Sequence, residues 1–478
     1  VRPIRPDDRR ALAAFHRGQS ERSRYLRFFA AIPELSDRDL DRFTQVDHDQ
    51  RVALVAEIGG EIIAIARFDR IDPTTAEVAF NVADEHQGRG LGSVMLEHLA
   101  AIGDEVGLGR FTADVLPENR QMMNVFTEAG YEVAHRFEDG VIAVSFDIEP
   151  NEHSREVRES REQRAEARSM VRVLRPESVV MIGVSRREET IGHKVLAEIV
   201  AGGYQGRLEV VHPEVGELAG ITTTPSVREV TGPIDLAIIA LPAETVHEVV
   251  ADCAAIGVRS VLVVSAGFAE AGPEGARRQR ELLRLVHYHG MRLVGPNSYG
   301  LSNSSPEVSL NATLGAPSVR GRFGLFAQSG ALGVSVTQMA RQRGVGLSTF
   351  VSAGNRADVS GNDVMQYWME DDDTAAVGLY LETLGNARKF FRISQRLSAK
   401  KPIIAIKSGT SGYGVPPGHL IRRSRAQPEA LDAMLRQSGI IRVSNLHQMF
   451  NIAQLVLHQP LPAGRGVAVV GNSTSLAA

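Results

Sequence analysis

The spacing of hydrophobic residues divides the chain into two regions that predict different kinds of sheet. Up to about Pro150, short strand-like runs alternate with helical ones, as in an α+β domain. Beyond Ser178 the hydrophobic runs are continuous, and glycine or proline and a helical stretch follow each one. Continuous runs of this kind are typical of parallel strands that are covered on both faces. The predicted strands are 52–58, 61–67, 77–82, 111–116 and 141–146 in the first region, and 179–184, 237–241, 261–264, 324–326, 376–381 and 403–407 in the second.

A charged segment, 151–172, separates the two regions. Arg and Glu alternate in it at helical spacing with almost no apolar face, which predicts a solvated helical linker. At the other end, residues 465–474 start a further strand and glycine turn, so we expect 463–478 to begin a truncated domain and the chain to be a fragment. The predicted division is 1–150, 151–172, 173–300, 301–462 and 463–478.

Composition excludes several classes of protein. No run approaches about 18 apolar residues and the amino terminus lacks a secretory pattern, so we expect a cytoplasmic protein that does not enter a membrane. The net charge of -4 gives no support to nucleic-acid binding. The single cysteine, Cys253, lies in an apolar helical stretch and is interpreted as a core residue of a protein from a reducing compartment. We predict no metal site.

A glycine loop, Gln87–Gly92, is the most informative motif. It follows the strand-like run 77–82 and leads directly into the helical pattern 93–100. Glycines let the backbone approach a ligand, and the free amides at a helix N-terminus point toward an anion, so the order of parts predicts a diphosphate cradle. A dinucleotide-binding fold would need a different glycine spacing and an acidic residue about 20 positions further on, and the loop has neither.

Residues 1–150 resemble the GNAT acyltransferases, which bind acetyl-CoA. The resemblance rests on four ordered features: the strand 76–82, the loop 87–92, Asn119 within 117–123, and the segment 126–131. It implies that the strand before the loop is splayed from its neighbour, so that its unpaired backbone holds the acetyl and pantetheine groups. The acetyl-CoA residues implied in this way are Phe80, Asn81, Val82, Gln87, Gly88, Arg89, Gly90, Gly92, Ser93, Asn119 and Phe126, with Phe126 or Tyr131 beside the thiol exit.

Acyl transfer to an amine needs the neutral amine, whereas a free lysine has a pKa of about 10.4, so a carboxylate must accept a proton. Glu77 lies one strand-length before the loop, is expected to point toward the gap between the splayed strands, and is the predicted general base. GNAT enzymes that acetylate protein lysines carry a glutamate at this place. The alternative is a solvated strand carboxylate, and His86 is interpreted as a residue of the groove rim.

Residues 174–478 resemble the CoA-binding and ligase domains of NDP-forming acyl-CoA synthetases. The matching stretches are 182–186, 191–196, 240–243, 265–270, 295–297, 328–331 and 351–355. The resemblance implies a Rossmann-like α/β CoA-binding domain followed by a flavodoxin-like, succinyl-CoA synthetase-like α/β ligase domain. It also implies a second CoA-type site formed by Gly183, Ser185, Arg186, Pro242, Ser265 and Gly267.

The ligase-like part departs from that family at the loop that would carry a phosphohistidine. Small residues surround the histidine in active synthetases, whereas here the loop reads Gly418-His-Leu-Ile-Arg-Arg-Ser424, and His419 aligns with that histidine only approximately. We therefore predict that phosphoryl transfer is lost. The ATP-binding domain that such a synthetase requires is also missing from the 478 residues, so this part is predicted to sense CoA or acyl-CoA as a regulatory ligand.

Together the two resemblances indicate a bacterial protein lysine acetyltransferase of the Pat type, with the GNAT domain at the amino end. This family implies that acetyl-CoA is the donor and that the acceptor is a lysine of another protein, typically an AMP-forming acyl-CoA synthetase that acetylation inactivates. Two alternatives stay open: an active NDP-forming acyl-CoA synthetase with an accessory GNAT domain, and a small-molecule amine N-acetyltransferase. Homo-oligomerisation is also left open.

Overall fold

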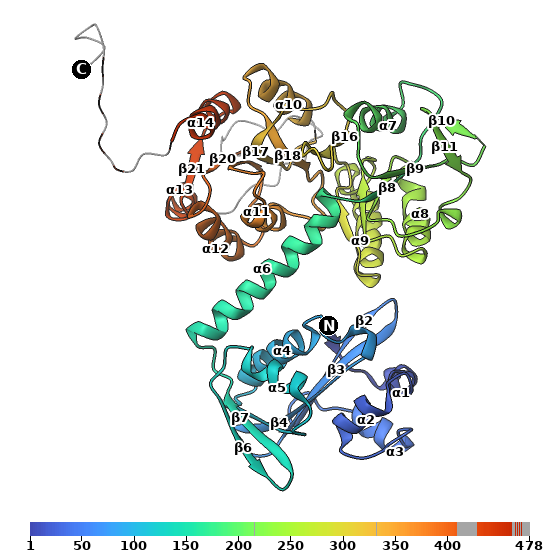
Figure 1. Ribbon diagram of the computed structural model, residues 1–478, viewed down its shortest axis with the longest axis vertical. Helices are drawn as coiled ribbons and strands as arrows, with labels where there is room; N and C mark the ends of the chain where they lie inside the picture. The colour runs from blue at the N-terminus through green and yellow to red at the C-terminus, as the bar shows by residue number, and fades with distance from the viewer. Residues whose placement is uncertain are drawn as a thin grey trace. The chain divides into compact units, whose positions relative to one another are not determined.

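The computed structural model describes residues 1–214, 216–330, 332–408 and 428–460, together with the single positions 464, 466, 468 and 470. It divides into a first unit, Val1–Ala165 with Tyr288–Gly290, and a second unit, Glu166–His287 with Met291–Ala478 (Figure 1).

The first unit contains a seven-stranded sheet in the order β1-β2-β3-β4-β5-β7-β6. Neighbouring strands are antiparallel except β4 and β5, which run parallel. Five strands agree with the predicted runs to within a few residues. The pattern misses β6, because its residues are exposed apart from the half-buried Val133 and carry no hydrophobic signal. The strands are β1 (Arg2–Pro3), β2 (Arg51–Ile58), β3 (Glu61–Arg70), β4 (Thr75–Val82), β5 (Arg110–Val115), β6 (Val133–Glu138) and β7 (Val141–Asp147).

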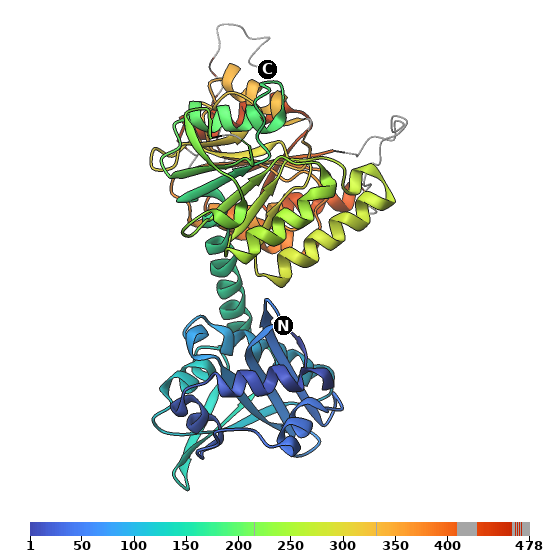
Figure 2. The ribbon, with the colours of Figure 1, turned by 90° about the vertical axis from the view of Figure 1, so that its right-hand side faces the viewer.

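Helices cover both faces of this sheet, and α1 crosses one of them in Figure 2. The alternation of β2 shows how: Leu54 packs into one hydrophobic cluster with Leu96 of α4, whereas Ala53 and Val55 pack into another with Leu12 of α1. Burial on both faces explains why β2 is a nearly continuous hydrophobic run. The helices are α1 (Arg9–Arg17), α2 (Glu21–Phe28), α3 (Asp37–Thr44), α4 (Leu91–Glu105) and α5 (Arg120–Thr127), with a 3-10 turn at Asp84–His86.

The predicted linker is a single helix, α6 (Glu152–Leu174). The expectation that residues 151–172 are solvated is wrong near their end, because Met170 is fully buried in the core of the second unit. Val173 and Leu174, which follow the predicted segment in the same helix, are buried in that core as well. These hydrophobic residues lie on one face of the helix, which an average over the charged segment hides. The division between the units accordingly falls inside α6, at Ala165 and Glu166.

The second unit begins with a seven-stranded sheet in the order β10-β11-β9-β8-β12-β13-β14. Its strands are parallel, as predicted, except for the antiparallel pair β10 and β11. The strands are β8 (Ser178–Ile182), β9 (Arg207–Val211), β10 (Glu217–Leu218), β11 (Ile221–Thr224), β12 (Leu236–Ile239), β13 (Ser260–Val263) and β14 (Arg292–Val294), and the helices are α7 (Ile191–Gly202), α8 (Ala243–Ala255) and α9 (Pro273–Tyr288).

A third seven-stranded sheet follows, in the order β16-β15-β18-β17-β19-β20-β21. Five of its strands are parallel, and β15 and β16 add an antiparallel edge. One hydrophobic cluster contains residues of both sheets of this unit, among them Met181 and Val351. The elements are β15 (Gly300–Asn303), β16 (Leu310–Thr313), β17 (Arg320–Ala327), α10 (Leu332–Gln342), β18 (Leu347–Ser352), α11 (Gly361–Glu370), β19 (Ala376–Leu381), α12 (Ala387–Ser398), β20 (Ile403–Lys407), α13 (Pro428–Gln437), β21 (Ile440–Val443) and α14 (Leu446–His458).

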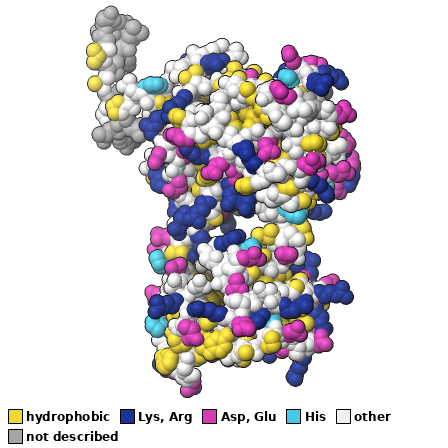
Figure 3. Space-filling model, turned by 45° about the vertical axis from the view of Figure 1, so that its right-hand side comes forward, with side chains coloured by type: hydrophobic (Ala, Val, Ile, Leu, Met, Phe, Trp, Pro, Cys, Tyr) yellow, Lys and Arg dark blue, Asp and Glu magenta, His cyan; other side chains and the backbone are white. Residues whose placement is uncertain are grey.

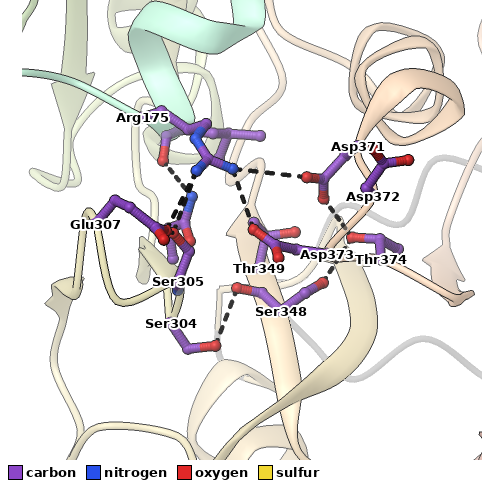
Figure 4. Close-up of polar contacts among 12 residues, drawn as sticks. Arg175, Ser304, Ser305, Glu307, Ser348, Thr349, Asp371, Asp372, Asp373 and Thr374 are labelled. Carbon is purple, nitrogen blue, oxygen red and sulfur yellow. Dashed lines mark hydrogen bonds and ion pairs between the residues drawn. The ribbon is translucent and has the colours of Figure 1, made fainter.

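A polar cluster fixes the carboxyl end of α6 within the second unit (Figure 4). Asn303 donates its side-chain amide to the backbone carbonyl of Leu174 at 2.8 Å, which satisfies one of the free carbonyls of the last turn. The guanidinium of Arg175 donates to Asp373 at 3.2 Å and to Ser305 at 3.3 Å, and lies 3.8 Å from Asp371. The end of α6 is thus tied to two loops of the third sheet.

Three sequence-based interpretations can be checked against the fold. Cys253 is fully buried, and burial raises the pKa of its thiol to about 12, as expected of a core residue rather than a nucleophile. None of the helices in the described ranges is long and apolar enough to cross a membrane. On the face drawn in Figure 3, basic and acidic side chains are interspersed, in keeping with the small net charge of -4.

Candidate functional site

Strands β4 and β5 separate within the sheet of the first unit. Their parallel pairing includes Thr75, Ala76 and Glu77 and ends there. Residues 80–82 of β4 still pair with β3 on the other side, so their backbone groups on the β5 side are not used by that ladder. A groove of about 340 Å³ lies at this place, lined by the end of β4, the glycine loop and residues of α2, α4 and α5. The splayed strand that the GNAT resemblance implies is therefore present.

The glycine loop ends where α4 begins. Gly88 and Gly90 have φ values of +72° and +80°, a left-handed conformation that strongly favours glycine, and Gly90 is the N-cap residue of α4. A Cβ atom at either position would meet nothing within 4 Å, so both glycines border open space. Free amides of the first helical turn and the positive end of the helix dipole suit a diphosphate at this place.

Most of the residues predicted to bind acetyl-CoA line this groove. Arg89 does not: it is exposed, and its guanidinium lies 3.3 Å from Nδ1 of His86, which itself borders the groove as predicted. The predicted residues in the lining are Phe80, Asn81, Val82, Gln87, Gly88, Gly90, Gly92, Ser93 and Asn119.

The structure contradicts the place predicted for Phe126. Its ring is 1% exposed and packs edge-on to Phe80, 6.0 Å between ring centroids, and against Phe146 at 5.4 Å. Tyr131 stacks on the same Phe146 ring at 5.3 Å and also lies outside the lining. Met122 and Phe126 lie four residues apart on the same face of α5, and both pack on the same hydrophobic cluster, but only Met122 also borders the groove.

Two of the lining residues shape the groove through their side-chain hydrogen bonds. Gln87 donates to the backbone carbonyl of Val82 at 3.2 Å and to the hydroxyl of Ser23 at 3.2 Å, which ties the loop to the end of β4 and to α2. Asn119 accepts from the backbone N–H of Met122 at 3.1 Å and so caps α5. Both side chains therefore stabilise the local fold at the edge of the groove that a ligand would occupy.

Glu77 lies where β4 and β5 part, but it is not among the residues that line the groove. Its side chain is exposed and, by strand alternation, projects from the same face as Ala79 and Asn81. Asp69 of β3 lies directly opposite in the ladder. The role of Glu77 as a general base stays a prediction.

Sequence reasoning missed the contribution of two helices to the groove. Helix α2 supplies Ser23, Leu26 and Arg27, and the segment around α5 supplies Gln121, Met122, Asn124, Val125 and Glu128. Helix α2 carries no glycine motif and no regular hydrophobic face, so its sequence gives no sign of a site. Only the chain path, which returns α2 to the end of β4, brings these residues to the groove.

The second predicted site is a pocket of about 750 Å³ beyond the carboxyl ends of β8, β12 and β13. Gly183, Ser185, Pro242 and Ser265 line it. Gly183 has a φ of +89°, and a Cβ there would lie 2.6 Å from the carbonyl oxygen of Ala240, so only glycine fits. The hydroxyl of Ser265 is buried without a hydrogen-bond partner among the described residues, which leaves it free for a ligand.

Two residues predicted for this second site lie outside the lining. Arg186 is exposed. Gly267 forms a turn: its N–H donates to the carboxylate of Glu270 at 2.6 Å and its carbonyl accepts from Arg278 at 2.6 Å. Its positive φ of +103° explains the glycine in structural terms. His419 and the rest of 418–424 lie outside the described residues, as does most of the predicted start of a further domain, 463–478.

Comparison with known proteins agrees with the three sheets. The acetyltransferase (GNAT) family matches residues 19–131, the CoA binding domain matches 177–304, and the succinyl-CoA ligase like flavodoxin domain matches 320–456. The α subunit of ADP-forming acetate–CoA ligase I from Pyrococcus furiosus is 32% identical over 310 residues, which is 64% of this chain and 67% of that subunit. The chain belongs to the ADP-forming acetate–CoA ligase family. It adds a GNAT acetyltransferase domain to that family's CoA-binding and ligase-like domains.

Two further comparisons concern one part of the chain each. The acetyltransferase Pat of Mycolicibacterium smegmatis is 35% identical over 128 residues, 26% of this chain and 38% of that protein. The structure of acetyl-coenzyme A synthetase 1 from Ca. Korarchaeum cryptofilum, with phosphate and ADP, is 30% identical and covers 62% of this chain and 64% of its own, with a TM-score of 0.58. The chain spans 42% to 67% of the lengths of the first ADP-forming acetate–CoA ligases that it matches.

Proposed function

We propose that the first unit transfers an acetyl group from acetyl-CoA to the ε-amine of a lysine in another protein. The observation that carries this proposal is the groove at the splayed end of β4, where free backbone groups lie beside the amino end of a helix. A diphosphate at the helix end would leave the thioester along residues 80–82, within reach of an amine entering between the strands. The same backbone groups can stabilise the tetrahedral oxyanion.

The proposed acceptor is an AMP-forming acyl-CoA synthetase, which acetylation would inactivate. Support comes from the GNAT domain's similarity to the acetyltransferase Pat and from its fusion to domains of CoA metabolism. In this proposal the second unit does not transfer phosphoryl groups and gauges CoA or acyl-CoA in the pocket beyond β8, β12 and β13. The loop sequence around His419, with two arginines and two bulky aliphatic residues, supports that assignment.

A labelling experiment tests the acceptor. The purified protein is incubated with a cell lysate and isotopically marked acetyl-CoA, and mass spectrometry locates the label. We expect marked acetyl-lysine on an acyl-CoA synthetase, and none with an E77Q protein added in equal amount. Label found on small amines, with none on protein lysines, would contradict the proposal and identify a small-molecule acetyltransferase.

A second candidate function, ADP-forming acyl-CoA ligation, is favoured by the 32% identity to the acetate–CoA ligase subunit over 310 residues. It requires a phosphoryl group on His419. We expect radiolabelled ATP to leave no phosphate on the purified full-length protein, with or without acetate and CoA. Label that disappears in an H419N variant would support the ligase and contradict a purely regulatory second unit.

A further inference from the structure

Arg27 of α2 and Asn81 of β4 together form a wall between two spaces in the first unit. Both residues line the groove proposed for acetyl-CoA. Both also line a smaller cavity of about 40 Å³ on the face of the sheet that α1, α2 and α3 cover. Arg67 of β3 lines the same cavity. The acyl end of the groove therefore meets a pocket that contains two guanidinium groups.

Several N–H donors around this wall have no acceptor in the part of the chain that the structure describes. Arg27 is half-buried, and within the described residues its guanidinium makes no hydrogen bond and no ion pair and lies 5.1 Å from the centroid of the Phe28 ring. Nε of Arg67 and Nε2 of Gln19 are also unpaired, although these residues are only 5% and 4% exposed. The Gln19 amide oxygen is already used, because it accepts from Asn81 at 2.8 Å. The surplus is one of donors.

Such a surplus is costly unless a ligand satisfies it. Burying an N–H donor such as Nε of Arg67 or Nε2 of Gln19 without an acceptor is unfavourable, because folding removes the donor from water and gives it no hydrogen bond in return. Burial and the nearby charge of Arg67 lower the pKa of Arg27 to about 10, so it is still a cation near pH 7, and the carboxylates of Glu77 and Asp69 offset only part of the effect. Asp69 is held by Arg67 at 3.2 Å, and Glu77 is not within ion-pair distance of Arg27.

We propose that Arg27, backed by Arg67 and Gln19, binds a carboxylate of the substrate at the acyl end of the groove. A carboxylate offers two oxygens to the planar fork of a guanidinium, which is the geometry that arginine recognises best. The inference rests on the proposed acyl transfer in this groove. The carboxylate has two sources: an acidic residue next to the acceptor lysine, or the far end of a dicarboxylic acyl group on CoA.

Binding measurements test this inference without requiring turnover. In one arm, calorimetry compares a lysine peptide containing an adjacent glutamate with its glutamine counterpart, both in the presence of CoA. In the other arm it compares succinyl-CoA with butyryl-CoA. We expect at least tenfold tighter binding of the carboxylate member in one arm, and the arm that responds identifies the source. An R27Q protein should lose that preference while binding the neutral member within threefold of wild type.

Arg22 provides the matched control, because it lies on the same helix but is exposed and does not line either space. An R22Q protein should keep the preference. Equal affinities for the charged and the neutral ligand in both arms would overturn the inference. An R27Q protein whose affinity falls equally for the charged and the neutral ligand would overturn it as well. Acetyl transfer to the neutral peptide is measured in parallel: its absence would count against the proposed function, whereas a missing carboxylate preference counts against Arg27 alone.

Discussion

The groove of the first unit and the pocket of the second place a glycine turn between a strand and a helix, yet they differ in what the strand offers. In the second unit β8 is paired along its length with β9 and with β12, so a ligand meets only the carboxyl ends of the strands. In the first unit β4 leaves β5 after Glu77, so backbone groups along the strand are free. A closed sheet is suited to holding a ligand, whereas a splayed one can also align it for reaction.

Loss of the Glu77 carboxylate, at the point where β4 leaves β5, is expected to have the largest effect, which is on the rate of acyl transfer. Replacing it by glutamine keeps the shape but removes the proton acceptor, so kcat should fall by about 10²- to 10⁴-fold. The Kd for acetyl-CoA should change little, because Glu77 does not line the groove. Stopped-flow assays and calorimetry measure the two quantities. E61Q, an exposed acid at the start of β3, is the control; unchanged turnover in E77Q would remove Glu77 from the mechanism.

The glycine turn of the first groove can be tested with a closely matched pair of variants. Gly90 and Gly107 have φ values of +80° and +81°, and a Cβ at either would meet nothing within 4 Å, but only Gly90 borders the groove. Both G90V and G107V should cost stability, about 1–2 kcal/mol from the left-handed backbone. Only G90V should weaken acetyl-CoA binding, by at least tenfold in calorimetry. Equal affinities of the two variants would show that this loop does not hold the diphosphate.

A smaller effect is expected at the pocket of the second unit. Ser265 lines this pocket and its buried hydroxyl has no hydrogen-bond partner among the described residues, so S265A should remove one hydrogen bond to CoA. The loss is about 0.5–1.5 kcal/mol, or roughly two- to tenfold in Kd. Calorimetry on a G90V background isolates this second site. The exposed T222A provides the control, and CoA affinity that S265A leaves intact would mean that the ligand does not reach this hydroxyl.

The smallest expected effect is a pH dependence of the stability of the first unit. His16 is 2% exposed and its Nε2 lies 2.9 Å from the carbonyl oxygen of Ile32, and burial lowers the pKa of its imidazole below the usual 6.5. The unfolded chain therefore takes up a proton near pH 6.5 that the folded unit resists, so stability falls as the pH falls from 7.5 to 5. The melting temperature of H16Q should depend less steeply on pH. The exposed H135Q should behave as wild type; a slope unaffected by H16Q would refute the assignment.

Much of the fold was predictable because local patterns of hydrophobic residues indicate where the strands lie. The strands at 376–381 and 403–407 were predicted to the residue, since a buried parallel strand is a continuous hydrophobic run. Strand β6 was missed because its exposed side chains leave no such run. The burial of the last turns of α6 was missed for a related reason: Met170, Val173 and Leu174 form a hydrophobic face too short to stand out in a charged segment.

The candidate sites divide in the same way. The loop 87–92 and its neighbouring strand could be identified from sequence, because glycine spacing and the step from strand to helix are local properties. The place of Phe126 could not, since a single turn of α5 decides whether a side chain faces the groove or the core. Arg27 could not be found either, because its proximity to Asn81 depends on how α2 folds back across residues 28–80.

The sequence by itself determined most of the strands and the glycine turns, because these follow from hydrophobic periodicity and from the backbone freedom of glycine, and its resemblance to two families indicated CoA as the ligand. Only the tertiary structure decided where β4 leaves β5, which turn of α6 is buried, and which donors remain without acceptors around Arg27. The physical reason is that pairing, burial and hydrogen-bond satisfaction depend on residues distant in sequence, whose meeting no local pattern records.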